Sequence, residues 1–153
     1  MKTAVRLLTL AITCLCPAIL RASDIQALLL DANYAKPVRW NVGASLFLSN
    51  GLSNEGGSGI MVGGSVGAGG MQVWGGKATL GNVGNTDVRA IVARTWDSPR
   101  GASANSTYLG GEVGWGLGVR LSVGYAKRIR GPSTDNDHVI TWGIGVDIPV
   151  WFR

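Results

Sequence analysis

The chain is poor in the residues that build metal sites and disulfide frameworks. It has two cysteines among 153 residues, Cys14 and Cys16, and a single histidine, His138. The carboxylates are scattered, and no group of cysteines and histidines has the spacing of a zinc site. No glycine-rich stretch leads into a helix, as a phosphate-binding loop requires. The composition therefore predicts no metal and no cofactor. What is abundant instead is glycine, with 24 residues, and tryptophan, with six.

The one long apolar run lies at the start of the chain. A short basic segment, Met1–Arg6, precedes an apolar stretch from Leu7 to Leu20, and Ala22 offers a small residue for cleavage. This three-part layout is typical of a secretory signal peptide, and the run is short for a transmembrane helix. We expect cleavage after Ala22, with Ala18 as the second choice. Residues 1–22 are then the signal peptide, and residues 23–153 form the folded domain.

Both cysteines fall inside this segment, so they contribute no disulfide to the domain. A lipoprotein would carry an acyl chain on one of them, but the preceding residues, Thr13 and Leu15, fit that signal poorly. Removal of residues 1–22 leaves eleven basic and nine acidic residues, which lowers the net charge from +5 to +2. This balance gives no support for nucleic-acid binding. The remaining 131 residues are one domain by length.

The end of the chain alternates between large apolar residues and mostly small or polar ones. Because side chains alternate faces along a strand, this stretch predicts one β-strand with a fully apolar face. At about 3.3 Å per residue it would be roughly 40 Å long, which suits a tilted membrane-crossing strand. The apolar positions are Ile140, Trp142, Ile144, Val146, Ile148, Val150 and Phe152.

The same alternation continues back through the domain, interspersed with glycine. Glycine within strands indicates close packing or a crowded interior, as a small barrel requires. Polar loops are expected at Asn50–Gly57, Gly81–Asp87, Asp97–Asn105 and Arg130–Asp137. The expected strands are Val38–Leu48, two within Ser58–Leu80 that turn near Gly67–Gly70, Val88–Trp96, Thr107–Trp115, Val119–Ala126 and Ile140–Phe152.

The clearest hairpin is the one that turns at Gly116–Gly118, and it is expected to pair Trp115 with Val119. Single-chain bacterial barrels have an even number of strands and both termini in the periplasm, so seven strands require an eighth. The best candidate is Ile25–Asn33, turning at Ala35–Pro37, although its leucines also suit a short helix. We therefore expect an all-β fold, an antiparallel up-and-down barrel of eight strands. Its long loops at 97–105 and 130–137 would face outward from the cell.

Polar residues on the strand face opposite to the apolar one predict a charge network inside the barrel. Glu112 and Arg120 lie on adjacent strands of one hairpin, displaced diagonally by two residues, and Arg39 has the parity to join them. In an eight-stranded barrel the interior is just wide enough to be filled by side chains. The expected interior is therefore plugged rather than open. In the alternative, these residues face water on an ordinary soluble sheet.

Four tryptophans lie near the ends of the expected strands: Trp40, Trp96, Trp115 and Trp151. An indole at a strand end can sit at the level of the lipid headgroups with its N–H group in water, so the four predict an aromatic girdle. The alternative is that they fill the core of a soluble β-protein.

Taken together, the strand pattern from Pro37 to Phe152 resembles that of small bacterial outer-membrane β-barrel proteins, of the kind represented by the OmpA transmembrane domain and OmpX. The final strand, ending in Phe152, is similar to the signal read by the barrel assembly machinery. Arg153 follows that residue, and Pro149 interrupts the row of backbone donors, which departs from the usual signal. The resemblance implies a monomer in the outer membrane that contacts lipid and lipopolysaccharide. It implies a non-enzymatic protein with a structural, surface-interaction or minor porin-like transport role.

Two further features bear on function. Lys127, Arg128 and Arg130 form a basic cluster that the expected topology places at the outer rim, where lipopolysaccharide phosphates would lie. In the alternative, the cluster only keeps an exposed strand edge soluble. His138 begins the last strand with Ser133 nearby in sequence, but no local motif places a nucleophile beside it. We therefore expect no enzyme activity.

Two other functions stay open at this point. In a soluble periplasmic or secreted barrel or sandwich, the apolar face would line the interior and bind an apolar ligand, as in lipocalin-like barrels. The other alternative is an outer-membrane enzyme that modifies lipid. The alternation itself does not tell which face of the strands points outward.

Overall fold

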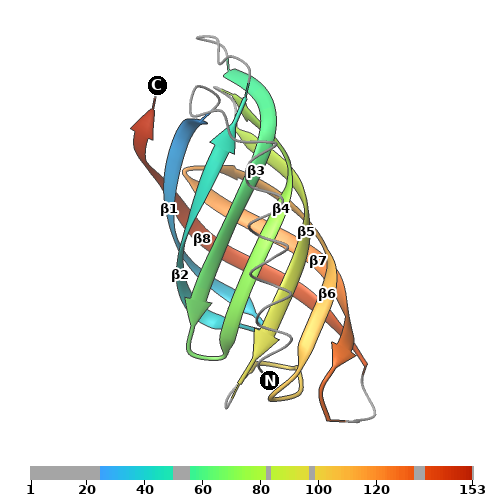
Figure 1. Cartoon of the computed structure of the whole chain (residues 1–153). Helices are drawn as coiled ribbons and strands as arrows, with labels where there is room; N and C mark the ends of the chain where they lie inside the picture. The colour runs from blue at the N-terminus through green and yellow to red at the C-terminus, as the bar shows by residue number, and fades with distance from the viewer. Residues whose placement is uncertain (1–24, 50–55, 82–83, 97–98, 133–136, 153) are drawn as a thin grey trace.

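The structure is a computed structural model that describes residues 25–49, 56–81, 84–96, 99–132 and 137–152, with side chains up to Val150. The expected signal peptide lies outside the described residues. Each strand pairs antiparallel with the next, and β8 pairs with β1, so the sheet closes into an up-and-down barrel (Figure 1). The strands are β1 (Ile25–Lys36), β2 (Arg39–Leu48), β3 (Gly56–Gly67), β4 (Gly70–Gly81), β5 (Asn85–Thr95), β6 (Thr107–Leu117), β7 (Val119–Arg130) and β8 (His138–Phe152). The expected fold class is confirmed. No helix in the described part of the chain is long and apolar enough to cross a membrane.

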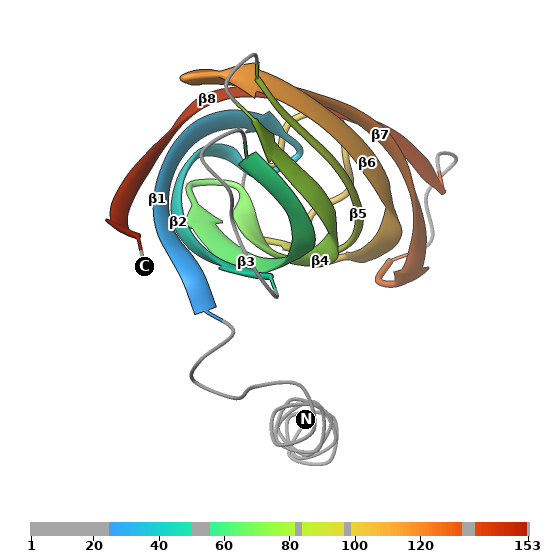
Figure 2. The same cartoon turned by 90° about the horizontal axis from the view of Figure 1, so that it is seen from above.

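The eighth strand is the one expected at the start of the domain. β1 is hydrogen-bonded to β2 on one side and to β8 on the other, so its leucine run is a strand rather than a helix. Its turn lies at Pro37–Val38, slightly later than expected. Seen along its axis in Figure 2, the wall forms a continuous ring, because β1 completes the circle between β2 and β8.

The β6–β7 hairpin keeps the expected faces but has a different register. Only Gly118 remains for the turn, with a φ of +76°, a left-handed conformation that favours glycine. Trp115 lies opposite Leu121 rather than Val119. Because side chains alternate with a period of two, this shift by two residues leaves each side chain on its expected face.

Proline disturbs the seam where the barrel closes. The register of β1 and β8 shifts between Leu28 and Leu29, which lie opposite Trp151 and Pro149. Proline has no N–H group to donate to the ladder, so it fits at a β-bulge better than within a regular pairing. The long last strand therefore reaches Phe152 by passing through an irregularity rather than by unbroken pairing.

The two ends of the barrel differ in their connections. The terminal end holds the start of β1, the end of β8 and the connections at 49–55, 82–84 and 118 (upper end in Figure 1). The loop end holds short turns at 37–38 and 68–69 and longer loops at 96–106 and 131–137. The longest connection, between β5 and β6, is thus at the end opposite to the start of β1 and the end of β8.

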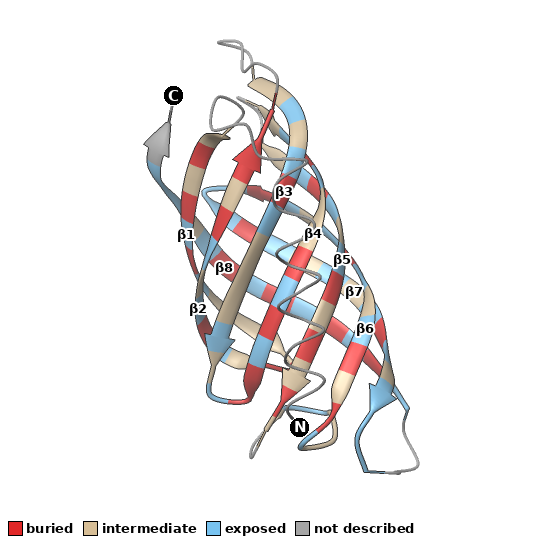
Figure 3. Cartoon of the chain, viewed as in Figure 1, coloured by how far each residue is buried: buried red, intermediate tan, exposed pale blue. Residues whose placement is uncertain are grey.

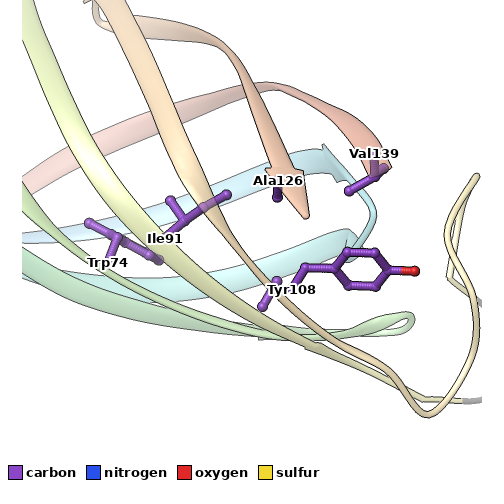
Figure 4. Packing of buried hydrophobic residues seen from close by; sticks show 6 residues of the cluster. Trp74, Ile91, Tyr108, Ala126 and Val139 are labelled. Atoms are coloured by element: carbon purple, nitrogen blue, oxygen red, sulfur yellow. The ribbon is translucent and has the colours of Figure 1, made fainter. Parts of the chain in front are cut away.

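Along the strands, exposed residues alternate with buried or half-buried ones, as the colours of the ribbon in Figure 3 show. Two apolar clusters fill the interior near the ends of the barrel. One lies toward the loop end and contains Trp74, Ile91, Ala93, Tyr108, Ala126 and Val139 (Figure 4). The other lies toward the terminal end and contains Ala27, Leu29, Phe47, Met61 and Ala78. Glycine makes room for them: a Cβ atom at Gly63 would stand 2.8 Å from the Trp74 ring.

Candidate functional site: the two faces of the barrel wall

The outer face of the wall is apolar along the described strands. Val123 is 53% exposed on β7 and Ile144 is 46% exposed on β8. The strand with the clearest alternation in the sequence, β8, therefore presents its apolar side to the outside of the barrel. This decides which of the two alternating faces points outward. The other exposed large apolar residues on the strands are Leu30, Trp40, Val42, Ile60, Val62, Val66, Met71, Val73, Val88, Leu109, Val113, Trp115, Leu117, Val119, Leu121, Tyr125, Ile129, Ile140, Trp142, Val146, Ile148 and Val150.

Five charged side chains on the inner face form a row of ion pairs with alternating sign. Arg89 donates to Glu112 Oε2 from Nη2 at 2.6 Å and from Nε at 3.0 Å. Arg120 donates to both carboxylate oxygens of Asp87, at 2.8 and 3.0 Å. Longer contacts join these pairs: Asp87 lies 3.9 Å from Arg89, and Asp147 lies 4.0 Å from Arg120. We call these five residues the charge chain, in the order Glu112, Arg89, Asp87, Arg120, Asp147. It connects β6, β5, β7 and β8 across the interior.

A glycine lets the charge chain cross a strand. Asp87 and Arg120 belong to β5 and β7, and β6 runs between them. The β6 residue beside Asp87 is Gly114, and a Cβ atom there would stand 2.4 Å from the Asp87 carboxylate and 2.2 Å from an Arg120 guanidinium nitrogen. Heavy atoms cannot approach so closely. The absence of a side chain at residue 114 is therefore what opens the path for this ion pair.

Two further contacts surround the charge chain. The Arg89 guanidinium lies 4.7 Å from the centre of the Trp74 ring, a cation–π contact with the loop-end cluster. Asp31 lies opposite Asp147 in the β1–β8 ladder, and its Oδ1 accepts a hydrogen bond from Asn33 at 2.7 Å. Within the described residues, no group of three or more carboxylates, histidines and cysteines has the arrangement of a metal site.

The expected interior residues meet different partners from those in the sequence analysis. Glu112 and Arg120 are both buried in the barrel, at 4% and 9% exposed, but each forms its close ion pair with a residue of β5. Their diagonal placement on one hairpin does not join them, because the two-residue change in register places Gly124 opposite Glu112. Arg39 lies at the first residue of β2 beside the loop end, with a φ of +67°. It forms no ion pair with the described residues and stands outside the charge chain.

Sequence reasoning missed the β5 half of the charge chain. The expected loop Gly81–Asp87 includes Asp87, and the strand expected after it has unclear faces because Arg89 and Arg94 have opposite parity. In the structure β5 begins at Asn85, so Asp87 lies within it and shares the inner face with Arg89. The signal that would have identified them is their spacing of two, in phase with the apolar inner residues Ile91 and Ala93.

A small cavity lies at the terminal end of the barrel. The described residues that line it enclose about 30 Å³, enough to hold an ordered water molecule. Its lining includes the apolar residues Leu29 and Met61 and the charged residues Asp87, Arg120 and Asp147. A cavity of this size does not hold an apolar ligand of the kind that a lipocalin-like barrel carries.

The β5–β6 loop covers the loop end of the barrel. Ala102 packs against the loop-end cluster. The Ser103 N–H donates to the Tyr108 hydroxyl at 2.8 Å, and its carbonyl accepts from the Thr95 hydroxyl at 2.6 Å. Earlier in the loop, the Arg100 N–H donates to the Pro37 carbonyl at 3.1 Å. The loop therefore reaches from β5 and β6 to the β1–β2 turn on the other side of the barrel.

The expected girdle tryptophans lie at both ends of the barrel. Trp40 is 70% exposed on the outer face at the loop end, and Trp115 is 54% exposed near the terminal end. Trp96 follows β5 at the loop end, and its indole N–H donates to the Ala68 carbonyl at 3.2 Å. The side chains of Trp151 and of Phe152, the expected assembly signal, lie outside the described residues. Trp142, which the sequence analysis did not single out as a girdle residue, lies outward beside Tyr34.

The basic cluster of β7 is at the loop end, but its members differ. Lys127 and Arg130 are exposed, whereas Arg128 donates to the Asp137 carboxylate and to the Pro132 carbonyl and so holds the β7–β8 loop. His138 lies exposed beside this cluster, with its ring stacked on Tyr125 at 5.4 Å. Its Nδ1 is hydrogen-bonded to the Tyr125 hydroxyl. Ser133 lies outside the described residues.

Comparisons of this chain with protein-family models, with curated proteins and with solved structures gave no match. The function is therefore inferred from the geometry of the chain itself.

Proposed function

We propose that the chain is a non-enzymatic outer-membrane β-barrel protein with a structural or surface-interaction role, and that its plugged interior allows at most minor transport. The observation that carries the proposal is the polarity of the wall: apolar side chains face outward, and ion pairs lie inside. Soluble monomers rarely expose a continuous apolar surface larger than a few hundred Å². Transmembrane barrels have an apolar outer band and a polar interior.

The backbone also meets the requirement of a membrane. Lipid offers no hydrogen bonds, so each backbone N–H and C=O group in the wall needs a partner strand. A closed barrel provides one for every strand, and here β8 pairs with β1 over most of its length. An open sheet with the same sequence pattern would leave two unpaired edges.

The interior supports a role other than open-channel transport. The charge chain extends from the middle of the barrel to the cavity at the terminal end, apolar clusters lie toward both ends, and the β5–β6 loop reaches across the loop end. In this proposal the termini face the periplasm, and the loops at 96–106 and 131–137 face outward, where they would meet partners. The assembly signal at Phe152, the contact with the barrel assembly machinery and the monomeric state belong to the same proposal.

The test is to express the full-length chain in a Gram-negative host, fractionate the cells and compare gel mobility with and without boiling. We expect the protein in the outer-membrane fraction, with a mobility that changes on heating because a closed barrel resists detergent until it is boiled. A protein in the soluble periplasmic fraction with unchanged mobility would contradict the proposal.

A further inference from the structure

Three aromatic side chains gather on the outer face at the loop end, where β1, β2 and β8 are neighbours. The Tyr34 ring centre lies 5.0 Å from that of Trp40, in an edge-to-face arrangement, and 5.8 Å from that of Trp142. Trp40 is 70% exposed, the highest exposure among the large apolar residues described. Aromatic side chains with one apolar and one wet edge are favoured at the boundary between hydrocarbon and headgroups.

Two cations reach the same place from different parts of the chain. Arg100, in the β5–β6 loop, lies with its guanidinium 5.7 Å from the centre of the Tyr34 ring and donates to the Tyr34 hydroxyl. Lys36 ends β1, and its ammonium lies against Gly101, since a Cβ atom there would stand 2.7 Å from Nζ. Neither cation forms an ion pair with a described carboxylate. Asp97, the sole carboxylate in the sequence of this loop, lies outside the described residues.

The cluster on β7 offers a contrast. There Arg128 is already bound to the Asp137 carboxylate, so part of its positive charge is compensated within the protein. The loop-end surface formed by Tyr34, Lys36, Trp40, Arg100 and Trp142, which we call the rim site, combines two cations and three rings. An anion bound at the rim site would supply a counter-charge that the described residues do not.

We propose that the rim site binds the phosphorylated headgroup of a membrane lipid, and this inference rests on the proposed function. Lys36 and Arg100 would contact phosphate oxygens, for which ammonium and guanidinium groups are suited donors. The headgroup sugars would lie against the exposed Trp40 ring. The acyl chains would follow the apolar wall toward the terminal end, along Leu30, Val42 and Ile144, which are all exposed on the same strands.

The test uses full-length protein purified from membranes in detergent and diphosphoryl lipid A as the probe, with bound lipid measured by native mass spectrometry. We expect the double variant Lys36→Gln, Arg100→Gln to bind about tenfold more weakly, as the loss of two charge-assisted contacts implies. Lipid A stripped of its phosphates should bind the unchanged protein about as weakly as diphosphoryl lipid A binds the double variant.

Two controls make the outcome specific. Lys77→Gln removes an exposed lysine of β4 near the terminal end, and Lys127→Gln removes one at the β7 cluster; both should retain binding. The rim site would be overturned if the double variant bound lipid A as tightly as the unchanged protein. It would also be overturned if Lys127→Gln lost as much binding as the double variant. If the double variant does not fold, Lys36→Gln alone carries the test, with about threefold weaker binding expected from one lost contact.

The heat-dependent mobility of each purified variant separates the two proposals. A chain without the mobility shift contradicts the proposed function and, with it, the rim site. A folded barrel that binds both forms of lipid A equally contradicts the rim site alone and leaves the proposed function standing.

Discussion

The inner and outer faces of this barrel follow opposite rules, although neighbouring residues of the same strands build them. On β7, Val119, Leu121 and Val123 are exposed, whereas Arg120 between the first two is buried and bound to Asp87. A protein folded in water has the reverse arrangement, because apolar burial drives its folding. Here the exposed face of the strands is apolar, and the buried face carries ion pairs as well as two apolar clusters. In the proposed function, lipid around the wall supplies the apolar environment for the exposed face.

The comparison also shows what each face demands of its residues. In the proposed membrane setting, the outer face requires only that side chains be apolar, because lipid adapts to their packing. The inner face requires matched charges and defined volumes, because a buried charge that loses its partner is left uncompensated. Substitutions should therefore have different consequences on the two faces, and three experiments test this, in order of decreasing effect.

The largest effect is expected from an unmatched charge on the inner face. Arg120→Leu leaves Asp87 buried without its two hydrogen bonds and should lower the free energy of unfolding by about 3–5 kcal/mol. Urea unfolding of the barrel refolded in lipid vesicles measures the change. The double variant Asp87→Leu, Arg120→Leu removes both charges and should recover most of the loss. If the double variant were as unstable as the single one, the cost would come from packing rather than from the unpaired carboxylate.

The next effect concerns the outer face. Val123→Lys places a charge near the middle of the apolar wall and should lower the free energy of unfolding in lipid vesicles by about 2–4 kcal/mol. Thr79→Lys, on the exposed face of β4 near the terminal end, is the matched control and should cost about 0–1 kcal/mol. A wall that faces water would tolerate both lysines within about 0.5 kcal/mol. Equal tolerance would thus contradict the membrane proposal.

The smallest effect compares two glycines of one strand that face opposite ways. Gly114→Ala pushes a methyl group into the Asp87–Arg120 pair and should cost about 1–3 kcal/mol, as overpacking does. Gly111→Ala points outward, with its nearest neighbour, the Arg89 carbonyl, at 3.7 Å, so its stability should stay within about 0.5 kcal/mol of the natural chain. Thermal unfolding in detergent is enough to rank the two variants. A tolerated alanine at residue 114 would show that the charge chain does not need this gap.

The amino-acid sequence alone was sufficient for the fold class, and particular residues show why. Alternation along Ile140–Phe152 has a period of two, which only a strand satisfies, and the requirement for an even number of strands identified Ile25–Asn33 as the missing one. Parity alone places Glu112 and Arg120 on the face opposite to the apolar one. An error in register of two residues leaves parity unchanged, so both lie on the inner face of the barrel although the β6–β7 pairing differs from the expected one.

Only the tertiary structure decided which residues meet inside the barrel. Asp87 and Arg120 are 33 residues apart and belong to strands that are not neighbours, so their contact depends on the curvature of the closed sheet and on the gap at Gly114. The rim site likewise joins Lys36 with Arg100 through a loop that crosses the end of the barrel. Alternation is a local property that each strand carries in its own sequence. Contacts across the interior depend instead on register, closure and loop path, which no single strand specifies.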